Sequence, residues 1–278
     1  MSYKIVVDSC CELPEQLKND RRFQSIPLTL EIGDYEIPDD ETFGQKDFLK
    51  RVAAYPLCPK SSCPSPEKYR EAYHDDAEEV YVVTLSSHLS GSYNSAELGK
   101  SLYEEKYGAK NIHVVDSESA SCGETQLAMK IVACKEAGLS FEQTVEAVET
   151  FKRQMRTYFV LDNLETLRKN GRLSSVKALV ASTLSIKPVM IGNQGVIEQK
   201  GQAIGINKAL AKVADGIVAD VDNPQERTLM ITHCNCPERA QYVRKLMEKR
   251  ASYKDVVIMD TAGISSMYAN DGGVIVTL

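Results

Sequence analysis

The sequence predicts an α/β fold of two domains, with a mainly parallel sheet in the first. Short apolar runs alternate with longer segments of helical periodicity along most of the chain. Most of these runs are apolar at successive positions, which is typical of strands buried on both faces of a parallel sheet. The 278 residues are enough for two ordinary domains. We expect an N-terminal α/β domain over residues 1–155 and a C-terminal α/β domain over 156–278.

Eight runs of three or four residues, rich in Val, Ile and Leu, predict the strands. They lie at residues 5–7, 80–83, 112–115, 159–161, 189–191, 229–231, 256–259 and 274–276. The run at 189–191 is followed by a second one at 196–198. Because Gly192-Asn193-Gln194-Gly195 joins the two, we expect a β-hairpin there.

Three sets of end signals delimit helices. Residues 140–143 (SFEQ) form a capping box, and apolar side chains then recur on one helical face. Ser65 followed by Pro66 predicts a helix start, since proline suits the first helical position. A further helix should end near Tyr107, with Gly108 as its stop.

Composition narrows the class of protein. The chain is 43% hydrophobic and 26% charged, which is typical of a soluble globular protein. Its net charge of −6 argues against a nucleic-acid partner, since nucleic acids are bound mainly through Lys and Arg. The apolar run at the N-terminus is too short for a signal peptide, so we expect a cytoplasmic protein without stable membrane insertion. The eight cysteines are then expected to be reduced and mostly buried.

A serine-rich segment, residues 84–96 (TLSSHLSGSYNSA), follows the predicted strand at 80–83 and contains no charged residue. Ser90 and Gly91 should open a helix, whose free N–H groups and positive dipole end bind anions. A second hydroxyl-rich segment, residues 60–65 (KSSCPS), also enters a helix. If the two segments meet, they form a neutral pocket for a carboxylate. The alternative is that Ser90 only caps its own helix.

The phrase Val-Val-Asp-Ser occurs twice, ending in Asp8-Ser9 and in Asp116-Ser117. Both copies follow a predicted strand, at the edge where open α/β sheets bind ligands. Asp and Ser also form turns and caps, which is the alternative interpretation of each copy.

The sequence offers little for catalysis. It contains no G-x-S-x-G elbow and no Gly-rich phosphate loop. His88 lies two residues from Ser90, but neighbours in a turn rarely share the geometry of a catalytic pair. The stretch His233-Cys234-Asn235-Cys236 has metal-ligand residue types, although its C-x-C spacing suits zinc poorly. We therefore expect no enzyme activity and no metal; the alternative is a serine- or metal-dependent hydrolase acting on a lipid ester.

Seven segments, taken in order and spacing, carry a resemblance to a known family. They are residues 4–9 (KIVVDS), 26–28 (IPL), 60–65 (KSSCPS), 85–96 (LSSHLSGSYNSA), 115–117 (VDS), 164–174 (LETLRKNGRLS) and 186–188 (IKP). Together they resemble the motifs of the DegV family of bacterial fatty-acid-binding proteins, some of which are acyl-carrier subunits of fatty acid kinase. The resemblance extends over essentially the whole chain.

This resemblance implies a lipid tunnel and a ligand. A long-chain fatty acid such as palmitate or oleate is expected as the ligand, with no cofactor. Its carboxylate is expected at Ser61 and Ser90, assisted by Ser62 and the Gly91 N–H, and a fatty acid kinase is the implied partner. Candidate tunnel residues are Phe159, Leu161, Leu164 and Leu184; the alternative for each is an ordinary place in the hydrophobic core.

Two departures from the family pattern leave the kinase partner open. The family's C-terminal histidine is missing from residues 263–273, where Ser265 or Ser266 is expected to take its place. The arginine found after the second hairpin strand in kinase-linked members is missing from residues 203–206. Arg172 is retained, either at the pocket mouth, as a docking residue for a partner, or as a surface arginine paired with a helix end.

Overall fold

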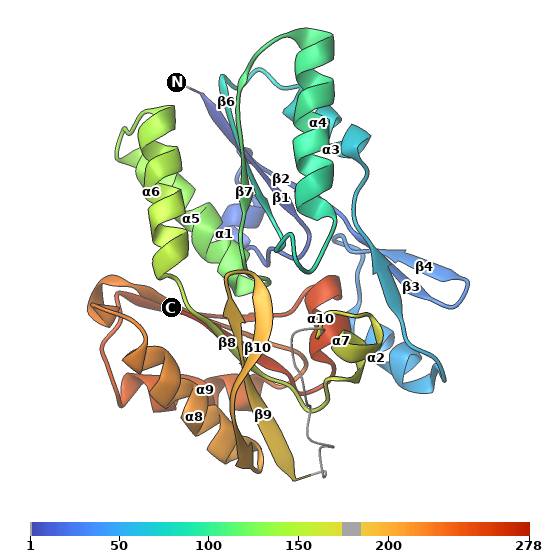
Figure 1. The fold of residues 1–278 in the computed structure, drawn as a ribbon, viewed down its shortest axis with the longest axis vertical. Coiled ribbons are helices and arrows are strands. Elements are labelled where there is room, and N and C mark those ends of the chain that lie inside the picture. Colours follow the sequence, from blue (N-terminus) through green and yellow to red (C-terminus); the bar gives the residue numbers. More distant parts are fainter. Residues whose placement is uncertain (1, 174–184) are drawn as a thin grey trace.

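The computed structural model describes residues 2–173 and 185–278, and within these ranges the strands form three sheets (Figure 1). β1–β7 belong to what we call the N-terminal half, and β8–β13 to the C-terminal half. The predicted mixed α/β class is confirmed. The predicted domain boundary between residues 155 and 156 stays a prediction.

The first sheet has four parallel strands in the order β2-β1-β6-β7. In β1, successive side chains alternate between faces: Ile5 and Val7 pack under α5 and α6, whereas Val6 packs against α3 and α4. This two-sided burial explains the continuous apolar run. The elements are β1 (Tyr3–Asp8), α1 (Glu15–Lys18), β2 (Phe23–Ile26), α3 (Pro66–Tyr73), β6 (Glu79–Thr84), α4 (Ser92–Tyr107), β7 (Asn111–Asp116), α5 (Cys122–Glu136) and α6 (Phe141–Gln154).

The second sheet has six strands in the order β10-β9-β8-β13-β11-β12. β11 and β12 run parallel, and the other four pairings are antiparallel. Helices α8 and α9 pack on one face of this sheet around a shared apolar core. The elements are β8 (Thr157–Val160), α7 (Glu165–Lys169), β9 (Ile186–Asn193), β10 (Val196–Ile204), α8 (Ile206–Ala219), the 3₁₀ helix η1 (Pro224–Glu226), β11 (Thr228–His233), α9 (Pro237–Glu248), β12 (Asp255–Asp260), α10 (Gly263–Ala269) and β13 (Val274–Thr277).

All eight predicted strands are present, but the parallel interpretation of their apolar runs is wrong for most of the second sheet. A central strand covered on both faces is apolar at successive positions whichever way its neighbours run. The run therefore reports burial and carries no information about direction.

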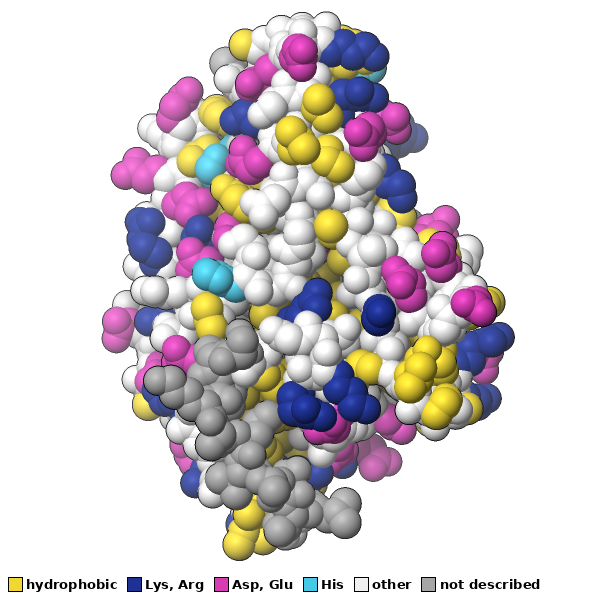
Figure 2. All heavy atoms as spheres, turned by 45° about the vertical axis from the view of Figure 1, so that its right-hand side comes forward, with side chains coloured by type: hydrophobic (Ala, Val, Ile, Leu, Met, Phe, Trp, Pro, Cys, Tyr) yellow, Lys and Arg dark blue, Asp and Glu magenta, His cyan; other side chains and the backbone are white. Residues whose placement is uncertain are grey.

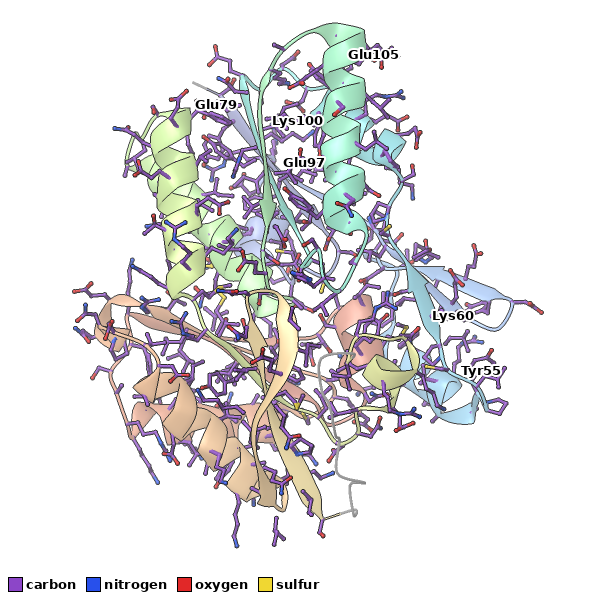
Figure 3. The ribbon with its side chains drawn as sticks, viewed as in Figure 1. Tyr55, Lys60, Glu79, Glu97, Lys100 and Glu105 are labelled. Atoms are coloured by element: carbon purple, nitrogen blue, oxygen red, sulfur yellow. The ribbon has the colours of Figure 1, made fainter. Side chains whose placement is uncertain are left out.

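The third sheet, β4-β3-β5, was not predicted. Its strands are antiparallel and short: β3 (Thr29–Ile32), β4 (Tyr35–Pro38) and β5 (Lys60–Ser62), with α2 (Gln45–Ala54) between the last two. Gly33, with φ +62, supports the tight turn between β3 and β4. Ser61 therefore lies on a strand, paired with Leu30 of β3, where sequence analysis expected a loop. In Figure 3, Lys60 and Tyr55 lie in the region of this third sheet. Glu79, at the start of β6 in the first sheet, lies far from them.

The predicted helix ends are confirmed. The Ser140 hydroxyl accepts the Gln143 N–H and the capping box is complete, α3 starts at Pro66 after Ser65, and α4 ends before Gly108 at φ +90. The predicted hairpin is formed by β9 and β10.

All eight cysteines are free, and five of them are buried. Cys63 is exposed, contrary to the expectation for a small apolar side chain. No helix in the described part of the chain is both long and apolar enough to cross a membrane. Basic and acidic side chains are intermingled over the face shown in Figure 2.

Gly99 lets α4 approach α3 closely. A Cβ at this position would lie 2.7 Å from the Pro66 carbonyl oxygen and 2.8 Å from the Tyr69 Cβ. Because α3 and α4 each follow one of the hydroxyl-rich segments, this contact sets the distance between those segments.

We expect Gly99→Ala to lower the free energy of unfolding by about 1–3 kcal/mol, because the added methyl overpacks the helix interface. Urea denaturation would measure it. Gly44→Ala is the control, since no atom lies within 4 Å of a Cβ built there. Equal stability of Gly99→Ala and the native protein would contradict the tight contact.

Candidate functional site

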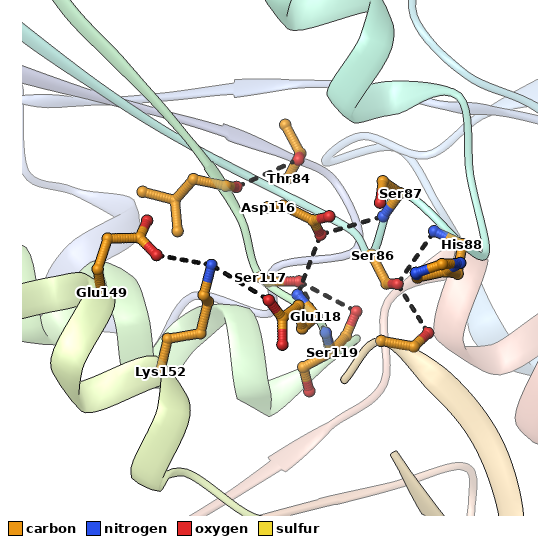
Figure 4. A network of polar contacts seen from close by, with 12 residues as sticks. Thr84, Ser86, Ser87, His88, Asp116, Ser117, Glu118, Ser119, Glu149 and Lys152 are labelled. Carbon is orange, nitrogen blue, oxygen red and sulfur yellow. Dashed lines mark hydrogen bonds and ion pairs between the residues drawn. The ribbon is translucent and has the colours of Figure 1, made fainter. Parts of the chain in front are cut away.

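The serine-rich segment after β6 is held by two carboxylates from the strands on either side. The Leu85 N–H donates to Asp8 Oδ2 at 2.9 Å, and the Ser87 N–H donates to Asp116 Oδ1 at 3.1 Å. Because β6 lies between β1 and β7 and all three run parallel, both aspartates lie at the same end of the sheet. Figure 4 shows Asp116 beside Ser87. The repeated Asp-Ser phrase thus acts in the turns, and its aspartates position the serine segment.

Ser86 connects this segment to the C-terminal half. Its hydroxyl accepts the His88 N–H at 3.2 Å and donates to the Gly195 carbonyl in the β9–β10 turn at 2.8 Å. The neighbouring Glu118 forms an ion pair with Lys152, which also pairs with Glu149 (Figure 4). The Ser86 hydroxyl therefore serves the fold.

Ser90 and Gly91 lie at the start of α4. The Ser90 hydroxyl accepts the Ser92 N–H at 3.2 Å, and Gly91 is the N-cap residue. A Cβ on Gly91 would lie 2.9 Å from the Cys63 sulfur, so the two hydroxyl-rich segments touch at this glycine. The predicted meeting of the segments is confirmed, and Ser90 also takes part in capping.

Ser61 faces a residue that sequence analysis missed. Its hydroxyl lies 3.1 Å from the hydroxyl of Tyr268, within hydrogen-bonding distance. Burial raises the pKa of Tyr268, while the Ser61 hydrogen bond and the nearby Arg172 charge oppose that rise. The tyrosine therefore stays a neutral donor near pH 7. Ser62, the next residue, is exposed.

Arg172 lies beside this tyrosine. Its guanidinium carbon is 5.9 Å from the centre of the Tyr268 ring, and its Nε donates to the Leu89 carbonyl at 3.1 Å. A further hydrogen bond goes to the Asn170 carbonyl. Arg172 lines the cavity, which agrees with a place at the pocket, and its bond to Asn170, the C-cap residue of α7, agrees with pairing to a helix end. The role of Arg172 stays a prediction.

A cavity of about 100 Å³ lies between the two halves, and Tyr268 and Arg172 are among its lining residues. The predicted head-group residues Ser61, Ser62, Ser90 and Gly91 do not line it. Its walls are mainly apolar and come from both sides: Leu85, Leu89, Phe159, Leu161, Ile197 and Ile264 are among them. The predicted tunnel residues Phe159 and Leu161 thus line the cavity. Leu164 is buried in the adjoining apolar cluster. Leu184, like Ser174 of the 164–174 motif, lies outside the described residues.

Helix α10 forms one wall of the cavity. Ile264, Ser265, Tyr268 and Ala269 line it. Ser266 points elsewhere, with its hydroxyl 2.7 Å from that of Thr261 and 3.2 Å from the Gln45 amide nitrogen. Of the two serines considered for the place of the family histidine, Ser265 faces the cavity, whereas the Ser266 hydroxyl has these polar partners. Residues 264, 265, 268 and 269 lie at positions i, i+1, i+4 and i+5, which share one face of a helix. This pattern was the sequence signal that could have identified Tyr268 as a cavity residue.

Four carboxyl groups of the N-terminal half are buried, and two of them, Glu12 and Asp39, accept N–H groups at the start of α10. The Glu12 carboxylate accepts the Ala262 N–H at 3.1 Å and the Ser121 hydroxyl at 2.6 Å. Burial raises the pKa of Glu12 to about 7 and that of Asp39 to about 6. Burial also raises the pKa of Asp8, and burial together with the Asp8 charge raises the pKa of Glu124 well above its usual range.

The residues behind the hydrolase alternative have structural partners. His88 lies against the β9–β10 turn, where its Cδ2 would be 3.0 Å from a Cβ on Gly195. His233 Nδ1 is 3.4 Å from the Cys236 nitrogen and 3.3 Å from an Asp260 oxygen. Over residues 2–173 and 185–278, no three His, Cys, Asp or Glu side chains are grouped so as to hold a metal ion.

The fold and the cavity define an α/β protein with a mainly apolar pocket between its halves and a few hydroxyl groups, among them those of Ser265 and Tyr268, in the pocket wall. The sequence profile of the DegV family, described as a family of uncharacterised proteins, matches residues 2–277. A DegV domain-containing protein of Streptococcus gordonii is 32% identical over 278 residues, covering 99% of this chain and 98% of the relative. This chain belongs to the DegV family.

Two solved structures are similar over their whole length. A DegV-family protein from Ruminococcus gnavus, refined with vaccenic acid, has a TM-score of 0.98 and 53% identity, covering 100% of this chain and 99% of that one. The fatty acid kinase (Fak) B3 protein of Streptococcus pneumoniae, loaded with linoleic acid, has a TM-score of 0.86 and 30% identity, covering 100% and 99%.

The raised pKa of Glu12 predicts a pH-dependent stability. The unfolded carboxyl ionises near pH 4.5 and the folded one near 7, so the stability that the group contributes is lost as pH rises between these values. The loss is about 3 kcal/mol at 1.36 kcal/mol per pKa unit.

We expect Glu12→Gln to remove this component, so that its free energy of unfolding falls less than that of the native protein between pH 5 and 8. Urea titrations across this range would measure it, with exposed Glu15→Gln as the control. Parallel pH profiles for Glu12→Gln and the native chain would show that Glu12 titrates normally.

Proposed function

We propose that this protein binds a long-chain fatty acid without transforming it. The observation that carries the proposal is the mainly apolar cavity, whose lining includes Tyr268 and Arg172. The Ser61 hydroxyl lies outside the lining, 3.1 Å from the Tyr268 hydroxyl. An acyl chain needs the apolar walls, and a carboxylate needs hydrogen-bond donors at one end. Palmitate and oleate have this chemistry.

The carboxylate would be held by Ser61 and Ser90, with the Gly91 N–H and Ser62 assisting. Ser61 and Tyr268 bring two hydroxyls to one place, and the contact between Gly91 and Cys63 keeps the second segment beside the first. These donors are neutral, so they orient a carboxylate without neutralising it. Each neutral hydrogen bond contributes about 1 kcal/mol, and more when its acceptor is charged.

Most of the affinity would come from the tail. Burial stabilises each CH₂ by about 0.8 kcal/mol, so a sixteen-carbon chain gains roughly ten kcal/mol before ordering costs. The hydroxyl groups would mainly fix which end of the ligand lies at the mouth.

The names of the relatives support this ligand class. The structures from R. gnavus and S. pneumoniae hold vaccenic and linoleic acid, and the latter protein is named as part of a fatty acid kinase. We extend to this chain the role of presenting a fatty acid to such a kinase. The missing histidine and arginine do not remove the pocket, and Tyr268 supplies a polar group on the helix that follows β12.

Purified protein should carry long-chain fatty acid from its expression host and, once delipidated, should take up palmitate or oleate saturably. Mass spectrometry of the extracted ligand and a fluorescent displacement titration would measure both. Delipidated, folded protein that takes up neither acid would reject the proposal.

We expect Ser61→Ala combined with Ser90→Ala to weaken palmitate binding about tenfold or more. Two hydrogen bonds to the carboxylate are lost, and each contributes about 1–2 kcal/mol to the binding free energy. The control is Ser101→Ala, since the exposed Ser101 hydroxyl donates only to the Glu97 carbonyl of its own helix. Unchanged affinity in the double variant, with its stability preserved, would place the head group elsewhere.

A further inference from the structure

We propose that Asp39 is a positioning residue for the lipid site: it anchors the start of α10 and so sets the position of Tyr268 and of the cavity wall. The inference rests on the proposed function, because the site in question is the fatty-acid pocket. Asp39 does not line the cavity, so it would act through α10.

Asp39 is buried, and its carboxylate accepts three hydrogen bonds. The Gly263 N–H donates to Oδ1 at 2.6 Å, and the Ile264 N–H donates to Oδ2 at 2.9 Å. The Ser9 hydroxyl donates to Oδ2 at 2.9 Å. The first two donors are N–H groups at the start of α10, which have no partner within the helix. The carboxylate therefore satisfies them and fixes where the helix begins.

The same small sheet holds α10 at both ends. Asp39 directly follows β4, and its own N–H donates to the Leu28 carbonyl beside β3. Ser61, on β5 of that sheet, contacts the Tyr268 hydroxyl. The sheet β4-β3-β5 thus contacts α10 at both ends: Asp39 binds the first turn, and Ser61 binds Tyr268 in the last turn.

The helix is short enough to transmit a shift. From Gly263 to Tyr268 it rises about 7–8 Å at 1.5 Å per residue. Between these ends, Ile264 and Ser265 face the cavity, so a movement of the first turn moves both the wall and the tyrosine. The first turn of α10 is closely packed, because a Cβ on Gly263 would lie 2.7 Å from Leu30 Cδ1 and 2.5 Å from Asp39 Oδ1.

The surroundings of Asp39 make this anchor sensitive to protonation. The titratable groups whose charges act on Asp39 are acidic: Asp8, the last residue of β1, and Glu12, which accepts the Ala262 N–H before α10. The pKa of Asp39, raised to about 6 mainly by burial, places its ionisation in an accessible range. Protonation turns one acceptor oxygen into a donor. The hydrogen bonds from the first turn of α10 to Asp39 therefore weaken as pH falls through that value.

The test is a double-mutant cycle between Asp39 and Tyr268, measured by palmitate affinity of the full chain. We expect Asp39→Ala alone to weaken binding about tenfold, and to weaken it less than threefold when Tyr268→Phe is already present, because Asp39 acts through the tyrosine. Asp215→Ala is the matched control, as exposed Asp215 pairs only with Arg250 in the described residues. Equal losses in both backgrounds would overturn the inference.

A second measurement needs no ligand. Amide hydrogen exchange over residues 263–269 should be faster in Asp39→Ala than in the native protein and unchanged in Asp215→Ala. Unchanged exchange in Asp39→Ala would overturn the inference even if no fatty acid bound. If native protein fails to take up palmitate while exchange behaves as expected, the proposed function fails and the anchoring role stands.

Asp39→Asn covers the case in which Asp39→Ala does not fold. The amide keeps an acceptor oxygen but does not titrate. Between pH 5 and 7, the palmitate affinity of Asp39→Asn should therefore change less than that of the native protein. Tyr268→Phe retains Asp39, so the amide exchange of α10 should change between pH 5 and 7 in this variant as it does in the native protein. A native-like pH profile in Asp39→Asn would contradict the role of Asp39.

Discussion

Buried or half-buried carboxylates that accept backbone N–H groups hold the parts of the site in place. Asp8 and Asp116 fix the serine segment after β6, while Glu12 and Asp39 fix the start of α10. Taking a carboxylate out of water is costly, and hydrogen bonds to peptide N–H groups offset much of that cost. The loop and the helix can therefore be held only where these donors and acceptors match.

The pocket combines this charged scaffold with neutral recognition groups. Asp8, Glu12 and Asp39 do not line the cavity, whereas Tyr268 and Arg172 do, and the Ser61 hydroxyl lies beside that of Tyr268. Donors are therefore available in the cavity wall, while the Asp8, Glu12 and Asp39 carboxylates accept hydrogen bonds from the protein itself. Such a site favours binding and orientation over bond breaking.

The sequence predicted the strands, most helix ends and the meeting of the two hydroxyl-rich segments, because these features repeat locally or follow family motifs. It missed the sheet β4-β3-β5, whose strands have three or four residues and include exposed positions such as Tyr35 and Lys60. It also missed Tyr268, since the search there was for a histidine or serine. Short, half-exposed strands lack the continuous apolar run that identified the others.

By itself the sequence determined where the chain is buried and where it turns, because alternation, caps and glycines act within a few residues. The tertiary structure decided strand direction in the second sheet and which side chains meet. Ser61 and Tyr268 are 207 positions apart, and Asp39 and Gly263 are 224 apart. Contacts over such separations depend on how whole sheets and helices pack, and no local pattern encodes them.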